Sequence, residues 1–302
     1  MRYPPVLCNA MPATSQPPAR HPLLPDVTLI GVTMLWGGTF LTVQTALEWV
    51  GPFGFVALRF GTAGLIALLL AGRLLAGLTA HELRAGVLIG SVLTLSYCLQ
   101  TVGLGSITSS KSAFLTALYV PLVPVFQWAM FRWRPPVAAW IGIAVAFAGL
   151  VLLADPNGLD SGFGQGEWLT LAGAAAIALE ICLVSRYAAD CNARRVTVVQ
   201  LFTVSCLAAA GAVAAGEPLP QAHPMLLVCV LGMGLATAVI QVAMNWAQKT
   251  VPATRATIIY AMEPVWAGLV GWLAGERLTV WMVTGAALIV VSVLISQLGR
   301  RS

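Results

Sequence analysis

Three charged residues lie within long apolar stretches of the sequence: Arg59, Glu180 and Glu263. An ionised side chain at the centre of a membrane helix costs about 2.5–3.5 kcal/mol, so such a group must face protein or water, or be neutral. Glu263 lies about ten residues into its stretch, at a depth of about 15 Å along a helix. Tyr260 shares its helix face. We interpret Glu263 as a cavity-facing acid that contacts a substrate or carries a proton. The alternative is an acid buried in helix packing, protonated or paired with Arg59.

The other two intramembrane charges also have two interpretations. Arg59 either makes a structural ion pair or caps backbone carbonyls, or it contacts the substrate. Glu180 lies nearer one end of its stretch and could reach water there. Both are therefore candidate functional charges.

Aromatic and amide side chains recur on single faces of several apolar stretches. In a bilayer, amides avoid lipid and either bond between helices or line a cavity. For each residue taken alone, packing is an open alternative. Together, aromatic rings with a few amides suit a small amphipathic solute, such as an amino acid with a bulky side chain. The predicted substrate-binding residues are Trp36, Phe40, Gln44, Tyr97, Gln100, Tyr119, Gln241, Asn245, Tyr260 and Glu263.

Prolines interrupt two of the apolar stretches, at Pro121 and Pro124 and at Pro264. Proline removes a backbone hydrogen bond and kinks a helix. Pro121 and Pro264 occupy equivalent positions in the repeat described below, so we expect them to act as a pair of hinges. The alternative is static kinks that shape a cavity. Full transport rates in both single alanine variants would remove the hinge role.

The composition is that of a membrane protein. Of 302 residues, 59% are hydrophobic and 9% charged, and the mean hydropathy is +0.87, whereas roughly a quarter of residues are charged in globular proteins. Only helices or closed barrels satisfy their backbone in lipid. Apolar stretches of about twenty residues favour helices. The net charge of +5 does not indicate nucleic-acid binding, because the basic residues form no stripe.

Motifs for other chemistry are missing from the sequence. There is no GxxxxGK[ST] loop for ATP, no GxSxG elbow and no HExxH helix. The six cysteines have no metal-ligand spacing. We therefore expect no cofactor, no metal and no enzymatic activity, although a membrane enzyme acting on lipids and a non-transporting scaffold stay as less favoured classes.

Ten membrane spans are predicted, and most of the 16 Lys and Arg residues lie on the side that holds both termini. The positive-inside rule therefore predicts that both termini are cytoplasmic. Residues 1–25, rich in proline, read as a disordered cytoplasmic tail, and 155–166 as a linker. The predicted spans are 27–49, 52–72, 85–104, 109–131, 136–154, 167–187, 196–215, 224–248, 253–274 and 279–298.

The two halves, 26–154 and 167–298, resemble each other. At one constant offset, Pro121 aligns with Pro264, which indicates a duplication. The same offset aligns Ala113 with Ala256, Arg134 with Arg277, Val137 with Val280 and Gly142 with Gly285. Because each half holds five spans, the second must insert upside down relative to the first. The expected fold is all-α, with ten transmembrane helices as two inverted five-helix repeats, an architecture of many secondary transporters.

Several of these motifs resemble the EamA-type transporters of the drug/metabolite transporter superfamily, over about residues 27 to 298. In the second half the similarity rests on Glu263-Pro264, on the turn Gly275-Glu276-Arg277-Leu278 and on Gly285. In the first half it rests on Trp36-Gly37-Gly38-Thr39-Phe40 and Arg59. The first half departs from the pattern, with Arg132-Trp133-Arg134 where the family often has a Gly-Glu turn.

This resemblance implies export of small metabolites from the cytoplasm across a bacterial inner membrane by alternating access. Amino acids with aromatic or apolar side chains are the leading substrate class, and cationic drugs are the alternative. The expected partners are the substrate, membrane lipid and, if the cycle is proton-linked, protons, with no nucleic acid. The pairs Gly86/Gly90 and Gly271/Gly275 are spaced for close helix approach, within one bundle or between two copies, so a monomer or a weak homodimer is expected.

Overall fold

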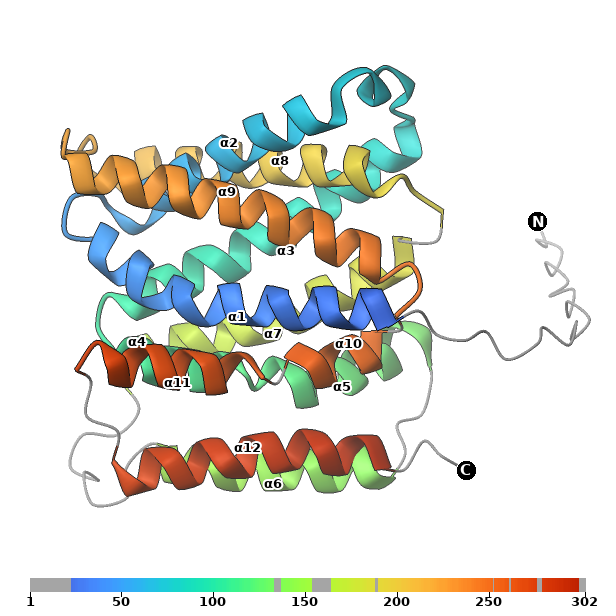
Figure 1. The fold of residues 1–302 in the computed structure, drawn as a ribbon, viewed down its shortest axis with the longest axis vertical. Coiled ribbons are helices and arrows are strands. Elements are labelled where there is room, and N and C mark those ends of the chain that lie inside the picture. Colours follow the sequence, from blue (N-terminus) through green and yellow to red (C-terminus); the bar gives the residue numbers. More distant parts are fainter. Residues whose placement is uncertain are drawn as a thin grey trace, which may run out of the picture.

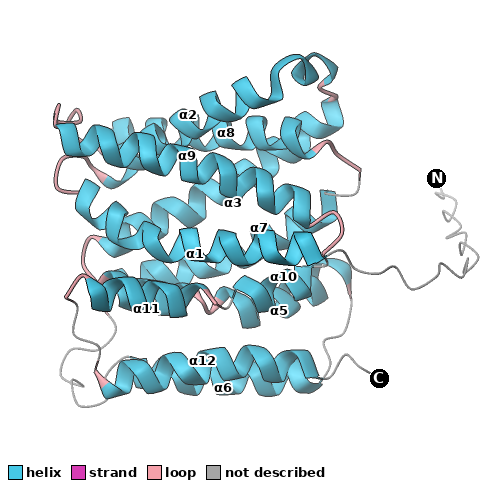
Figure 2. Ribbon diagram, viewed as in Figure 1, coloured by secondary structure: helices cyan, strands magenta, loops and turns pink. Residues whose placement is uncertain are grey.

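The computed structural model describes residues 23–132, 137–153, 164–187, 190–251, 253–260, 262–275 and 279–298. These residues form helices joined by turns, and the described chain contains no strand (Figure 1, Figure 2). In chain order the elements are α1 (Leu23–Ala46), α2 (Pro52–Ala71), a 3-10 helix (Gly72–Gly77), α3 (Ala80–Leu104), α4 (Ser109–Thr116), α5 (Tyr119–Phe131), α6 (Val137–Leu153), α7 (Gln165–Tyr187), α8 (Ala193–Ala214), α9 (Pro224–Ala247), α10 (Ala253–Tyr260), α11 (Glu263–Leu273) and α12 (Val280–Leu298).

Seven segments of the described chain are long and apolar enough to cross a membrane. Large apolar side chains such as Leu65, Leu69 and Val228 are exposed on the outside of the bundle. A soluble protein rarely leaves so much apolar surface in contact with water, whereas a bilayer accommodates it. The protein is therefore an all-helical membrane protein. The seven segments are Leu23–Ala46, Pro52–Gly77, Ala80–Leu104, Ser109–Met130, Gln165–Tyr187, Ala193–Ala214 and Pro224–Ala247.

The remaining predicted spans correspond to α6, to α10 with α11, and to α12. Helix α1 begins at Leu23, inside the predicted tail of residues 1–25, and residues 1–22 lie outside the described part. Most of the predicted linker, up to residue 163, also lies outside it, as do Arg134 and the turn residues 276–278.

Helix α3 begins five residues before the predicted start of its span at residue 85. Thr79 is its N-cap: its hydroxyl accepts a hydrogen bond from the backbone N–H of Glu82, while the Glu82 carboxylate accepts one from the backbone N–H of Thr79. This reciprocal capping box satisfies two N–H groups that would otherwise lack partners. The hydropathy of the sequence placed the start of this helix too late, because Glu82 and His81 lower the hydropathy of its first turn.

Two of the spans are broken into paired short helices. Helix α4 ends at Thr116 and α5 begins at Tyr119, while α10 ends at Tyr260 and α11 begins at Glu263. Pro121 and Pro264 each lie in the first turn of the second short helix, where a missing N–H costs nothing. The breaks therefore precede these prolines. Pro124 was expected to interrupt its span, but α5 continues through it.

The two halves of the chain pack against each other in matching pairs. Helix α1 contacts α9 and α11, and α7 contacts α3 and α5 in the same way. Helix α2 contacts α9 as α8 contacts α3, and the α2–α8 and α6–α12 pairs complete the pattern. In Figure 1, α4 lies beside α11 at the left, and α5 lies beside α10 at the right. The two broken spans therefore run in opposite directions.

Figure 1 also shows that α1 begins and α12 ends at the same end of the bundle, on the right. We call this the terminal end and the opposite one the distal end. At the terminal end, Arg195 on α8 contacts the carboxylate of Glu82 at 3.3 Å. At the distal end, Lys111 on α4 contacts the carboxylate of Glu167 on α7 at 2.6 Å. Each ion pair joins one half of the chain to the other.

The pair Gly86/Gly90 packs inside this bundle. A Cβ atom at Gly86 would lie 2.6 Å from Val199, and one at Gly90 would lie 2.7 Å from Thr203. Both neighbours are on α8, so the two glycines allow α3 and α8 to approach closely. This contact joins the two halves of one chain.

Candidate functional site

A small cavity lies between the two halves of the chain, lined by residues from α1, α3, α5, α7 and α11. Its volume is about 30 Å³, which leaves room for about one water molecule. We call it the central cavity. Its lining residues are Trp36, Thr39, Phe40, Tyr97, Gln100, Tyr119, Ile177, Glu180 and Glu263.

Glu263 reaches the central cavity because α10 breaks just before it. It is the first residue of α11 and is 4% exposed. The hydroxyl of Tyr119, the first residue of α5, donates a hydrogen bond to its Oε2 atom at 3.2 Å. The two broken spans thus bring the starts of their second short helices together.

Glu180 lines the same cavity from α7 and is 3% exposed. The expectation that it could reach water at the end of its span is wrong for this structure. Its Oε1 atom is buried and has no hydrogen-bond partner among the described residues. A buried oxygen without a partner is costly, so this atom is available to a ligand's donor group.

The electrostatic character of the central cavity is acidic and aromatic. Two carboxyl groups face it, and none of the described lining residues is Lys or Arg. The rings of Trp36, Phe40, Tyr97 and Tyr119 form much of its wall. Aromatic faces attract cations, and a carboxylate accepts hydrogen bonds from an ammonium group. The arrangement therefore suits a single ammonium group, which is about as much as a volume of about 30 Å³ can hold.

Arg59 lies behind the cavity wall and does not line it. It is 2% exposed, and its Nε atom donates a hydrogen bond to Oγ1 of Thr237 at 2.7 Å. Its guanidinium carbon lies 4.9 Å from the ring centroid of Tyr97 and 5.4 Å from that of Phe60. An ion pair with Glu263 is not among the ion pairs of the described residues. Arg59 instead holds Tyr97 in the cavity wall by a cation–π contact.

Four of the residues predicted to bind substrate do not line the central cavity: Gln44, Gln241, Asn245 and Tyr260. The amide of Gln44 donates to the backbone oxygen of Ile107 at 3.4 Å. The ring of Tyr260 contacts that of Trp36 edge-on, with centroids 5.1 Å apart. Tyr260 therefore supports the cavity wall from behind.

Gln241 and Asn245 belong to a buried amide network between α8 and α9. The amide of Gln200 donates to Oε1 of Gln241 at 2.8 Å. The amide of Asn245 donates to Oγ1 of Thr197 at 2.9 Å and lies 3.2 Å from Oε1 of Gln200. All four side chains are buried. These hydrogen bonds join α8 to α9, which is the arrangement that the packing alternative describes.

Asn245→Ala is expected to destabilise the protein without changing the transport rate of the folded molecules. The substitution removes the donor to Oε1 of Gln200, a buried acceptor, which costs about 1–3 kcal/mol, whereas Thr197 keeps its hydrogen bond to the backbone oxygen of Ala193. Unfolding in detergent, followed by circular dichroism, measures the loss. Ser91→Ala is the control, because that hydroxyl bonds only within its own helix and its loss leaves stability unchanged. A stable Asn245→Ala protein that no longer transports would contradict the packing role.

Three cavity residues were not among the predicted binding residues: Glu180, which was a candidate functional charge, and Thr39 and Ile177, which were not singled out for their side chains. Thr39 belongs to the Trp36–Phe40 motif, and Ile177 precedes Glu180 by almost one helical turn, so both lie beside predicted residues. Helical spacing from Trp36, Phe40 and Glu180 could have identified them.

The chain is similar to known transporters over nearly its whole length. It matches the EamA-like transporter family over residues 23–154 and 164–298, one range in each half. It is 31% identical over 278 residues to an uncharacterized transporter of Archaeoglobus fulgidus, covering 91% of this chain and 86% of that protein. It is 27% identical to the uncharacterized inner membrane transporter YedA of Escherichia coli (strain K12), covering 90% of each.

The fold is also similar to a solved crystal structure of a protein, with a TM-score of 0.70. The superposition covers 92% of this chain and 97% of that one at 19% identity, so this likeness concerns the fold alone. The family match covers both halves and includes every residue that lines the central cavity. This chain belongs to the EamA-like transporter family.

Proposed function

We propose that this transporter exports small metabolites from the cytoplasm by alternating access at the central cavity, with aromatic or apolar amino acids as the leading substrate class. The observation that carries the proposal is the pair of buried carboxyl groups, Glu180 and Glu263, enclosed by aromatic rings between the two halves of the chain.

The chemistry of an amino acid fits this cavity. Its ammonium group can donate to Glu180 and Glu263, and the aromatic rings attract the same positive charge. The amide of Gln100 lines the wall and donates one N–H to Oγ1 of Thr116 at 3.0 Å; its second N–H suits the carboxylate of the amino acid. Because two acids face the cavity and no Lys or Arg is among its described lining residues, export of cationic compounds is the second candidate function.

The packing supports an architecture of ten spans in two inverted repeats. The main helix contacts recur when each helix is exchanged for its counterpart in the other half, and the broken spans α4–α5 and α10–α11 run in opposite directions. Two similar halves of opposite orientation can exchange conformations, so that the cavity opens to one side and then to the other. In this proposal Pro121 and Pro264, in the first turns of α5 and α11, act as hinges.

The distribution of charges supports cytoplasmic termini. Arg73, Arg84, Arg194 and Arg195 lie at or next to the helix ends of the terminal end. At the distal end the carboxylate of Glu217 accepts hydrogen bonds from the backbone N–H groups of residues 53 and 54 at the start of α2. By the positive-inside rule the terminal end then faces the cytoplasm. The relative YedA is named an inner membrane transporter, which agrees with a bacterial inner membrane.

Counterflow in sealed vesicles tests the proposal. Purified protein is reconstituted into vesicles loaded with unlabelled phenylalanine, and labelled phenylalanine is added outside. We expect transient accumulation of label that depends on the internal amino acid and that aromatic and apolar amino acids suppress best in a panel of all twenty. Vesicles without protein are the control. No counterflow with any amino acid would contradict the leading substrate class, and counterflow of an organic cation alone would favour the second candidate.

A further inference from the structure

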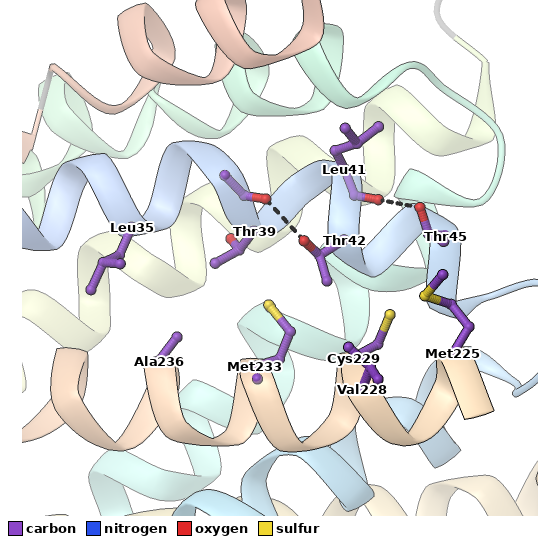
Figure 3. Close-up of a pocket in the computed structure, with 12 residues that line it drawn as sticks. Leu35, Thr39, Leu41, Thr42, Thr45, Met225, Val228, Cys229, Met233 and Ala236 are labelled. Atoms are coloured by element: carbon purple, nitrogen blue, oxygen red, sulfur yellow. Dashed lines mark hydrogen bonds between the residues drawn. The ribbon is translucent and has the colours of Figure 1, made fainter. Parts of the chain in front are cut away.

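A second, larger space lies between α1 and α9 on the outside of the bundle. It has a volume of about 490 Å³. Figure 3 shows that Met233 and Cys229 point from α9 toward α1, across from Thr39 and Thr42. We call it the α1–α9 groove.

The α1–α9 groove is apolar although threonines line it. The Thr39 hydroxyl donates to the backbone oxygen of Trp36 at 2.7 Å, and that of Thr42 donates to the backbone oxygen of Gly38 at 3.2 Å (Figure 3 shows the second bond). These hydroxyl groups therefore bond to the backbone of α1. The surface of the groove is formed by the threonine methyl groups and by the sulfur atoms of α9. At its mouth, Leu35 is 44% exposed and Val228 is 64% exposed, so the groove opens toward the membrane.

The groove adjoins the central cavity. Thr39 lines both spaces, and its neighbours Trp36 and Phe40 on α1 line the central cavity. The two spaces differ in size and chemistry: the central cavity has about 30 Å³ and two carboxyl groups, whereas the groove has about 490 Å³ and no ionisable residue other than Cys229 among its lining residues. An amphipathic amine has a charged end, which matches the central cavity, and an apolar end, which matches the groove.

We propose that the α1–α9 groove is the subsite for the apolar side chain of the transported amino acid, whose ammonium group binds Glu180 and Glu263. This inference rests on the proposed function. It adds the place in the structure where selectivity for the length of the side chain arises. The side chain passes Thr39 from the acidic space into the apolar one. A phospholipid acyl chain also matches the apolar wall, but it carries no group that satisfies the two acids.

Two glycines that line the groove can be replaced by a large side chain to test its role. A Cβ atom built at Gly38 or at Gly232 meets nothing within 4 Å, and both residues line the groove, one on each helix. Tryptophan at either position can therefore fill the groove without a backbone clash. Gly31 is the matched control: it also lies on α1 with nothing within 4 Å of its Cβ position, but it does not line the groove.

The test measures inhibition of counterflow by alanine, norvaline, norleucine and 2-aminooctanoic acid. In the unaltered protein we expect the inhibition constant to fall about threefold to fourfold for each added methylene, as for burial of a CH₂ group. Gly38→Trp and Gly232→Trp are expected to abolish this dependence on length while the constant for alanine stays the same. Gly31→Trp is expected to keep the full series.

The alanine constant shows in each variant that the folded protein and its central cavity are intact. A length dependence that survives in both groove variants would overturn the subsite, as would an equal loss of affinity for all four compounds. A lipid in the groove predicts the first of these results. If the unaltered protein shows counterflow but no length dependence, the subsite alone fails; if it shows no counterflow with any amino acid, the proposed function fails as well.

Discussion

Glu263→Gln is expected to weaken substrate binding about 10-fold to 100-fold, because a hydrogen bond to a charged group contributes about 1.5–3 kcal/mol. Glutamine has the same length, so its side-chain oxygen can still accept the hydrogen bond from Tyr119, which lies 3.2 Å from the present carboxylate. The link between the starts of α5 and α11 is thereby kept. What is lost is the acidic group that faces the central cavity and can carry a negative charge or a proton. Competition for counterflow at several concentrations of unlabelled substrate measures the change.

The same variant also tests proton coupling. If Glu263 carries the coupled proton, Glu263→Gln removes the dependence of net flux on pH while exchange of substrate for substrate continues at saturating concentration. Glu48→Gln is the matched control, because Glu48 is exposed at the distal end, and it is expected to change neither quantity. Unaltered affinity and an unaltered pH profile in Glu263→Gln would remove this residue from both roles.

The acids of the cavity were predictable from sequence because their environment is so unfavourable for a charge. Glu180 and Glu263 each stand alone in an apolar stretch, and a bilayer leaves such a residue few places other than the interior of the bundle. The aromatic residues Trp36 and Tyr97 followed from sharing helix faces with polar groups. That these two spans are interrupted was predictable, because proline removes a backbone hydrogen bond from a helix. The positions of the breaks were not, because a proline fits the first turn of the following helix and the break therefore lies upstream of it.

The amides could not be assigned in the same way. Gln241 and Asn245, one turn apart on α9, have the same pattern whether they face a cavity or another helix. The difference lies in Gln200 and Thr197 on α8, which supply partners for them. Which helix faces α9 depends on the arrangement of the whole bundle, and no local spacing contains that information. Arg59 is a similar case, because its partner Thr237 is far away in sequence.

Two adjacent glycines on α1 are expected to respond in opposite ways to the same substitution. A Cβ atom at Gly37 would lie 2.5 Å from Cβ of Trp266 and 2.8 Å from the backbone nitrogen of Ala267, both on α11. A helix backbone cannot move aside as a side chain does, so Gly37→Ala is expected to destabilise the protein by about 1–3 kcal/mol. Gly38→Ala meets open space and is expected to be neutral or slightly stabilising, because alanine favours a helix by about 1 kcal/mol over glycine.

Thermal unfolding in detergent compares the two variants, and counterflow adds the functional consequence. Helices α1 and α11 belong to different halves of the chain, so in an alternating-access cycle the contact at Gly37 must change as the halves move. A methyl group there disfavours the arrangement in which α1 packs closely against α11, relative to one in which the two helices separate. We therefore expect the folded fraction of Gly37→Ala to transport more slowly than that of Gly38→Ala. Equal stability of the two variants would mean that Gly37 does not face α11. The orientation of α1 that directs Trp36 and Phe40 toward the central cavity would then be contradicted.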